Sequence, residues 1–191
     1  MKSRLLLIIL GYLLIGATVS IAQGGEKMAN NKKVLVVYYS KTGNTERVAK
    51  DIASRLHADI EKITDKKNRS GFLNYFFAAK DASKKSLTEL GELQKNPVNY
   101  DLTIIGTPIW AWNMAPAVRA YLTKTGKQLK KVAFFTTSGN TDPKKVVGYM
   151  EEVSGKKAIA LTGFNAKELK DKKIYDEKIS AFVTEIVRQN K

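Results

Sequence analysis

The segment from Ser40 to Thr45 combines side-chain hydroxyls with a glycine, and this combination favours the binding of an anion. It reads Ser-Lys-Thr-Gly-Asn-Thr and follows the apolar residues 34–39. Where a buried strand passes into a helix, backbone N–H groups and the positive end of the helix dipole meet at one point, which suits a phosphate group. An ordinary N-cap turn has the same composition, so the segment alone leaves both interpretations open. It matches neither G-x-x-x-x-G-K-[ST] nor G-x-G-x-x-G, so it carries no ATP or NAD fingerprint.

The apolar segments along the chain predict strands that alternate with helices. We expect strands at residues 34–39, 58–63, 101–106, 132–136 and 158–161. Continuous apolar runs of this length indicate parallel strands that are covered on both faces. Between them, apolar residues recur at helical spacing, as Val48, Ile52 and Leu56 do. The alternation predicts an α/β fold, a doubly wound parallel sheet with helices on both faces, whose ligand lies at the carboxyl ends of the strands.

Two further segments follow the third and fourth predicted strands and therefore reach the same edge of the sheet. Residues 106–114 read Gly-Thr-Pro-Ile-Trp-Ala-Trp-Asn-Met, and residues 136–140 read Thr-Thr-Ser-Gly-Asn. Together with Ser-x-Thr-Gly-x-Thr, they make the chain resemble flavodoxins from Lys33 to about Val187. The resemblance implies a flavodoxin-like five-stranded sheet in the order 2-1-3-4-5. It also implies the cofactor FMN, bound without a covalent link.

The resemblance implies three groups of FMN-binding residues. The phosphate loop would consist of Ser40, Lys41, Thr42, Gly43, Asn44 and Thr45. The loop around the isoalloxazine ring would consist of Thr107, Pro108, Ile109, Trp110, Ala111, Trp112 and Asn113. The third loop would line the ring with Thr137, Ser138, Gly139 and Asn140. Either Trp110 or Trp112 is expected to stack on the flavin, because an aromatic ring at this edge offers a π-face to a planar ligand.

Three functions are compatible with this resemblance. The first is electron transfer through bound FMN. The second is an FMN-dependent NAD(P)H:quinone reductase, because residues 113–119 resemble the flavodoxin-like quinone oxidoreductases and no tyrosine between Thr137 and Pro143 would cover the second face of the flavin. The third is a basic binding module that uses the scaffold without a cofactor. No catalytic residue is assigned, since the flavin would supply the chemistry.

The composition limits both the chemistry and the partners. The chain has no cysteine and one histidine, His57, which excludes thiolate nucleophiles, disulfides and a histidine-based metal cluster, so no metal ligands are assigned. We read His57 as the end of the first helix. The formal net charge of +15 favours anionic partners. We expect a redox partner protein or a small-molecule quinone, with an anionic membrane surface as a further candidate; no recognition motif indicates nucleic acid.

The first 22 residues have the order of an export signal. Lys2 and Arg4 precede an apolar run at residues 5–22, and Ser-Ile-Ala stands before Gln23 as a cleavage site. A retained membrane anchor is the alternative. Residues 23–32 would then be a linker and residues 33–191 an exported or membrane-anchored FMN-binding domain. Translation from Met28 would instead place the domain in the cytoplasm.

Overall fold

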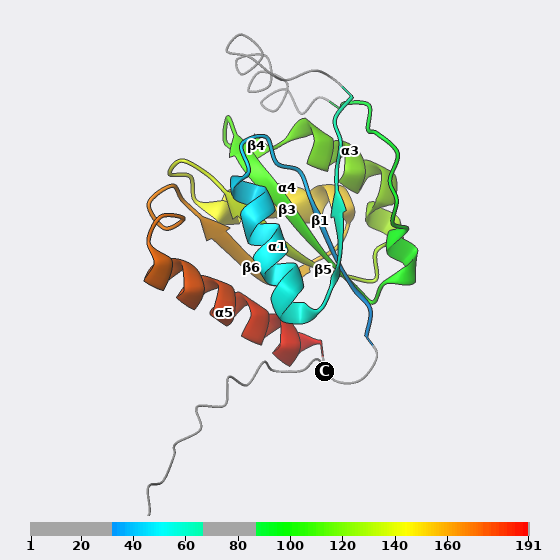
Figure 1. Cartoon of the computed structure of the whole chain (residues 1–191). Helices are drawn as coiled ribbons and strands as arrows, with labels where there is room; N and C mark the ends of the chain where they lie inside the picture. The colour runs from blue at the N-terminus through cyan, green and yellow to red at the C-terminus, as the bar shows by residue number, and fades with distance from the viewer. Residues whose placement is uncertain (1–31, 67–86, 191) are drawn as a thin grey trace, which may run out of the picture.

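A computed structural model describes residues 32–66 and 87–190, which form a sheet between helices (Figure 1). The strands are β1 (Val34–Tyr38), β2 (Asp59–Lys62), β3 (Leu102–Trp110), β4 (Asn113–Met114), β5 (Lys131–Thr137) and β6 (Ala158–Phe164). The helices are α1 (Asn44–Leu56), α3 (Pro116–Thr125), α4 (Pro143–Ser154) and α5 (Lys172–Gln189), with single 3-10 turns η1 (Pro97–Asn99) and η2 (Gly126–Gln128). Within the described ranges, no helix is long and apolar enough to cross a membrane. The expected signal or anchor at residues 1–22, the linker up to residue 31 and the start at Met28 lie outside them.

The strand order agrees with the prediction. The path through the sheet is β2-β1-β3-β5-β6, and each neighbouring pair along it is parallel. Counted as five parallel strands, this is the expected order 2-1-3-4-5. The sheet has a sixth strand that the sequence did not indicate, because β4 pairs antiparallel with the end of β3. Parallel pairing brings the carboxyl ends of β1, β3 and β5 to one edge, where the three predicted loops begin.

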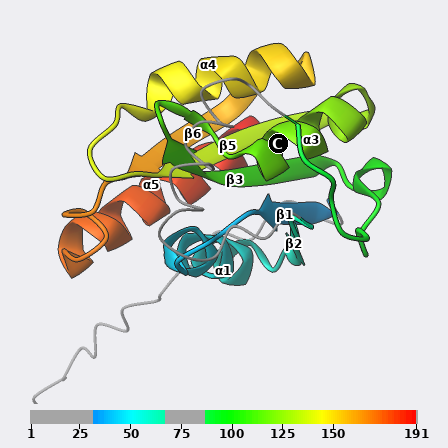
Figure 2. The same ribbon diagram turned by 90° about the horizontal axis from the view of Figure 1, so that it is seen from above.

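The helices cover the two faces of the sheet in pairs, as Figure 2 shows from above. Helices α1 and α5 form one core with Val36 and Phe135 of the sheet. Helices α3 and α4 form the other core with Leu35 and Phe134. Neighbouring residues of a strand therefore enter opposite cores, which is why the central strands are apolar throughout rather than alternating with polar residues.

Strand β5 extends one residue beyond its predicted bounds at each end, and two other strands extend much further. β3 reaches Trp110 instead of ending at Gly106, because residues 107–108 still pair with β5 and residues 109–110 pair with β4. β6 continues to Phe164 because its last residues pair with the end of β5. Glycine and proline in these stretches favoured loops locally, but the partner strands override that preference. Part of the segment that we expected to be a loop is therefore strand.

Glu46 fastens the helix after the first loop to the edge strand β2. Its carboxylate lies 2.8 Å from the ammonium group of Lys50 on α1 and 2.8 Å from that of Lys62 on β2. Hydrogen bonds from these two groups lower the pKa of Glu46 from 4.5 to about 2. Burial, together with the neighbouring Glu46 carboxylate, raises the pKa of Tyr38 to about 12. The charge of Glu46 thus contributes to the position of α1 on the sheet.

Stability is expected to decrease in acid as Glu46 becomes protonated. A carboxylate with a depressed pKa in the folded state contributes its full stabilisation above its unfolded pKa and loses it as the pH falls through the folded pKa. For Glu46 that window runs from pH 4.5 to about 2. Urea unfolding should show Glu46→Gln to be less stable than wild type at neutral pH and nearly equal to it at the acid end of this window. The same exchange at the exposed Glu92 should have little effect at either pH. A Glu46→Gln difference that does not narrow in acid would contradict the assignment.

Candidate functional site

The first loop joins β1 to α1 and leaves the N-terminus of the helix available to a ligand. Gly43 has a backbone φ of +91°, a conformation that residues with a side chain rarely adopt. Its N–H donates to Ser40 Oγ at 3.1 Å. The first helical hydrogen bond runs from the Arg47 N–H to the Gly43 carbonyl at 2.9 Å, so the N–H groups of residues 44–46 have no acceptor within the helix. No side chain caps α1. The loop is therefore suited to hold an anion, rather than being an ordinary capped turn.

Thr45 connects the first loop with the third. Its side chain is buried, and its Oγ1 lies 2.8 Å from Oγ1 of Thr137 at the end of β5. By contrast, Thr42 and Asn44 are exposed and Lys41 is half-buried. Two of the predicted phosphate-loop residues, Ser40 and Thr45, thus use their hydroxyls in hydrogen bonds that shape the site, whereas Thr42 and Asn44 face solvent.

The second loop is a β-hairpin instead of the open loop we expected. Residues 109–110 of β3 pair with residues 113–114 of β4, which leaves Ala111 and Trp112 as a two-residue turn. Their φ angles are +45° and +59°. Positive φ at both positions is the type I′ pattern, which fits the twist of paired strands but normally selects Asn-Gly. For other residues this conformation costs on the order of 1–3 kcal/mol each, so the turn has to be held by its surroundings.

The two tryptophans of this hairpin lie in opposite environments. Trp110 is 9 % exposed and packs edge-on against Tyr39, with ring centroids 5.6 Å apart and an interplanar angle of 87°. Trp112, at the tip of the hairpin, is 71 % exposed. A planar ligand can reach the face of Trp112, whereas Trp110 belongs to the core under α3 and α4. The geometry therefore favours Trp112 for the stacking role, which stays a prediction.

Thr107 anchors the start of α3 to the end of the parallel sheet. Its buried hydroxyl accepts from the Ala115 N–H at 3.0 Å and donates to the Pro108 carbonyl at 2.9 Å. Pro108 and Ile109 are partly exposed, so they line the surface beside the hairpin. Thr107 thus acts on the shape of the second loop, and its hydroxyl is engaged within the protein.

Beneath the hairpin lies a residue that sequence reasoning missed. Arg119 of α3 is 6 % exposed, and its Nη2 donates to Oδ1 of Asn113 at 2.8 Å. The same oxygen accepts from the Met114 N–H at 2.9 Å. Burial lowers the pKa of Arg119, and the carboxylate of Glu152 opposes this effect. The only signal in the sequence is an arginine between the apolar positions 118 and 121 of a helix.

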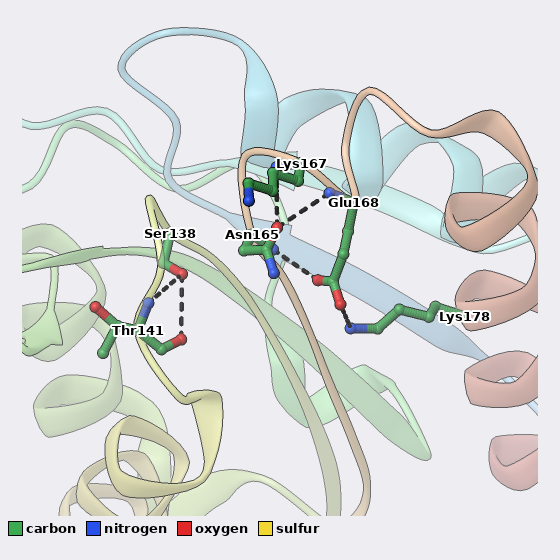
Figure 3. A network of polar contacts seen from close by, with 6 residues as sticks. All are labelled: Ser138, Thr141, Asn165, Lys167, Glu168 and Lys178. Atoms are coloured by element: carbon green, nitrogen blue, oxygen red, sulfur yellow. Dashed lines mark hydrogen bonds and ion pairs between the residues drawn. The ribbon is translucent and has the colours of Figure 1, made fainter.

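The third loop, residues 138–142, is a tight turn closed by Ser138 (Figure 3). The Ser138 hydroxyl accepts from the Thr141 N–H at 3.0 Å and donates to the Thr141 carbonyl at 3.2 Å. The backbone N–H of Ser138 donates to the Phe164 carbonyl at 2.9 Å, which ties the loop to β6. Gly139 and Asn140 are exposed. Of the four residues predicted for the third loop, Thr137 instead ends β5 and is buried and Ser138 is half-buried, so only Gly139 and Asn140 are fully accessible to a ligand.

The neighbouring loop after β6 is held by Asn165 and Glu168, which Figure 3 shows beside Ser138. Asn165 Oδ1 accepts from the N–H groups of Lys167 and Glu168 at 2.9 and 3.0 Å. The Glu168 carboxylate accepts from the Asn165 N–H at 2.8 Å and pairs with Lys178 at 2.9 Å. Burial acts to raise the pKa of Glu168, but these hydrogen bonds outweigh it and the pKa is lowered. This network holds the loop after β6 in place, and the Ala166 N–H of that loop donates to the Gly139 carbonyl of the third loop.

His57 and the cavity that it lines lie away from the three predicted loops. His57 is the C-cap of α1, as expected, with φ +49°. It lines a cavity of about 690 Å³ together with Lys33 and Tyr100 at the amino end of the sheet. None of the predicted FMN-binding residues lines that cavity. The structure thus brings the three predicted loops together at the carboxyl edge and leaves this cavity outside the site.

Strand order and loops together define a flavodoxin-like domain, and comparison of the sequence with protein families identifies the family. The chain belongs to the flavodoxin family, whose model, described as Flavodoxin, matches residues 33–185. No curated protein matches the sequence. The match includes all three loops and ends within α5, so it covers nearly all of the described domain.

Solved structures with the same fold include several flavoproteins. A flavoprotein from Lactobacillus acidophilus NCFM, in complex with FMN, is 24 % identical with a TM-score of 0.59; the match covers 73 % of this chain and 97 % of that one. Oxidised Flavodoxin 2 from Bacillus cereus is 17 % identical with a TM-score of 0.53, over 82 % and 99 % of the two chains. A WrbA-like flavodoxin from Agrobacterium tumefaciens is 16 % identical with a TM-score of 0.51, over 84 % and 100 %. Membership of the flavodoxin family supports the prediction of FMN as the cofactor, and these solved structures share the fold.

Proposed function

We propose that this domain binds FMN without a covalent link and transfers electrons through it. The observation that carries this proposal is the meeting of two features at one sheet edge: the uncapped N-terminus of α1 and the hairpin that exposes Trp112. The first suits the phosphate group, and the second suits a planar ring. Bound FMN supplies the redox chemistry, while the protein supplies binding and electrostatics.

The residues of the site fit the parts of this cofactor. The N–H groups of residues 44–46 lie where a helix dipole stabilises a phosphate. Trp112 would stack on one face of the ring. Gly139 and Asn140 would approach the ring from the third loop. Because residues 138–142 contain no aromatic side chain, the second face of the ring would stay open.

Absorption spectroscopy tests this proposal directly. The purified protein, mixed with FMN and freed of the excess, is expected to keep the visible absorption bands of flavin. Riboflavin, which has the same ring without the phosphate, should bind more weakly because the N-terminus of α1 contributes nothing to its binding. A protein that stays colourless after this treatment would contradict the proposal and favour a cofactor-free scaffold.

The third loop, which exposes Gly139 and Asn140 and has no aromatic side chain, also favours a second candidate, an FMN-dependent NAD(P)H:quinone reductase. Hydride transfer requires the nicotinamide to lie against the flavin, and the exposed Gly139 and Asn140 leave room for it. Steady-state assays with NADH or NADPH and a benzoquinone separate the two functions. Turnover that requires both substrates would indicate the reductase. Flavin that accepts electrons from a chemical reductant but not from NAD(P)H would indicate an electron carrier.

Lysines near the same edge favour an acidic protein as the electron-transfer partner. Helix α4 begins with Pro-Lys-Lys and α5 with Lys-Lys, and neither has an acidic residue in its first turn. The helix dipole disfavours such cations by about 0.3–1 kcal/mol each, and the caps Asp142 and Asp171 offset only part of this charge. Both helices start at the carboxyl ends of β5 and β6. We therefore infer that these lysines attract an anionic partner to the cofactor edge.

Small electron acceptors of opposite charge test this inference. Reduced wild-type protein should react with ferricyanide at a rate that falls as salt is added, and replacing Lys144, Lys145, Lys172 and Lys173 by glutamine should slow that reaction. With the cationic oxidant hexaammineruthenium, the rate should instead rise as salt is added and should also rise when the four lysines are replaced. Rates that are equally insensitive to salt and to the four substitutions would remove the argument for an acidic partner. Sedimentation with anionic vesicles separately tests the membrane surface as a partner.

A further inference from the structure

Arg119 is a buried cation that the proposed contacts with FMN do not explain. It lies on α3 and is 6 % exposed, and its Nε has no hydrogen-bond partner among the described residues. Among the described residues, no carboxylate forms an ion pair with this guanidinium, although the charge of Glu152 acts on it from a greater distance. Burying a guanidinium in this way is unfavourable, and an apolar side chain of similar volume would fill the same space without that cost. Its presence on the buried side of the helix therefore points to a role that an apolar side chain could not perform.

The contact of Arg119 with Asn113 suggests that role. Arg119 Nη2 donates to Asn113 Oδ1 at 2.8 Å, and this oxygen also accepts from the Met114 N–H at 2.9 Å. Asn113 is buried, pairs with Trp110 in the antiparallel ladder and directly follows the turn at Ala111 and Trp112. Hydrogen bonds from ionised donors are the stronger ones in proteins. The guanidinium thus fixes the first residue of β4 from below.

The turn needs such a fixed neighbour because its backbone is strained. Ala111 and Trp112 both adopt positive φ without being glycine, and conformations of this kind persist only where the surrounding structure imposes them. A binding loop that is held in place before the ligand arrives also avoids the entropy loss of ordering it. A charged donor bonded to Asn113 beside the turn meets both needs.

We propose that Arg119 is a positioning residue that holds the Ala111–Trp112 turn, through Asn113, in the conformation that receives the flavin ring. The link to the ring rests on the function proposed above. The link between Arg119 and the conformation of the turn does not, and it can be measured in the absence of any flavin.

Riboflavin binding tests the effect on the ring, because riboflavin does not use the phosphate loop. Arg119→Met and Asn113→Ala should each raise the riboflavin dissociation constant roughly tenfold, the factor that corresponds to one hydrogen bond of this kind. The double variant should bind about as weakly as Asn113→Ala alone, because both substitutions remove the same bond. Arg119→Lys, which keeps a cationic donor, should lose less than Arg119→Met. Additive losses, or equal losses for the lysine and methionine variants, would overturn the proposal.

Tryptophan fluorescence tests the effect on the turn in the free protein. The chain has two tryptophans, so Trp110→Phe leaves Trp112 as the reporter. In that background, Arg119→Met should lower the fluorescence anisotropy of Trp112, with helix content by circular dichroism unchanged. Lys124→Met removes an exposed cation from the same helix and should leave the anisotropy as it was. Unchanged anisotropy in Arg119→Met would contradict the proposal. If Arg119→Met does not fold, Asn113→Ala and Arg119→Lys provide the same comparison.

Flavin binding and the anisotropy of Trp112 test the proposed function and the positioning role of Arg119 independently. If wild-type protein binds neither FMN nor riboflavin, the proposed function is wrong, and the anisotropy still decides whether Arg119 holds the turn. If flavin binds and the anisotropy does not respond to Arg119, the function stands and the positioning role is wrong.

Discussion

Trp112→Ala is expected to weaken FMN binding by roughly tenfold to a hundredfold without a matching loss of stability. Stacking of an aromatic side chain on a planar base contributes about 1–3 kcal/mol to binding, and a flavin presents a similar surface. Because Trp112 is 71 % exposed, its removal should change the free energy of unfolding by no more than about 0.5 kcal/mol. Quenching of FMN fluorescence gives the affinity, and urea unfolding of the free protein gives the stability.

Two other variants make this result specific. Trp110→Phe should show the opposite pattern, a loss of stability with a smaller change in affinity, because Trp110 packs in the core against Tyr39. Gly43→Ala should weaken FMN but not riboflavin, because it strains only the loop assigned to the phosphate. If Trp112→Ala binds FMN as tightly as wild type, the ring does not stack on this side chain and the site must be assigned differently.

Gly106→Ala is expected to lower the free energy of unfolding by about 3 kcal/mol, near the upper end of what overpacking costs. A Cβ at this position would lie 2.0 to 2.5 Å from three atoms of the Phe135 ring. Phe135 is fully buried and pairs with Gly106 across β3 and β5, so its ring has little room to move. Urea unfolding of the free protein measures the loss.

The chain offers a matched control for this exchange. Gly148→Ala lies inside α4, where an added Cβ meets no atom within 4 Å. It should raise stability by about 0.5–1 kcal/mol, since alanine is the better helix residue. The double variant Gly106→Ala with Phe135→Leu should recover part of the loss if the ring is its cause. A Gly106→Ala protein as stable as wild type would show that the strands can separate locally at this point.

The sequence was sufficient to predict the parallel sheet and the first loop, because both depend on local patterns. Apolar runs located the strands, and hydroxyl residues with Gly43 located the turn before α1. The hairpin was not predictable in this way. Ala-Trp is not a turn sequence, and Gly106 followed by a proline two residues later indicates the end of a strand when its partners are unknown. Pairing with β5 and β4 decides the outcome there.

Arg119 shows a second limit of sequence reasoning. A charged residue in a helix is normally assigned to the solvent side. Its burial depends on an acceptor from another element, the side chain of Asn113, whose position follows from the hairpin. The choice between Trp110 and Trp112 depends on the same unpredicted turn. Once β3 is known to reach Trp110, that residue belongs to the sheet and Trp112 to the tip.

The two ends of the described chain meet at the edge of the sheet opposite the three loops (Figure 1). Lys32 Nζ donates to the Asn190 carbonyl, and the Lys33 N–H donates to Asp101, just before β3, at 3.0 Å. The polypeptide therefore enters the domain on the side remote from Trp112. If the protein is fixed to a bead or an electrode at a point ahead of Lys32, the edge proposed to bind FMN will face away from the support. A dissolved reaction partner can then approach that edge directly.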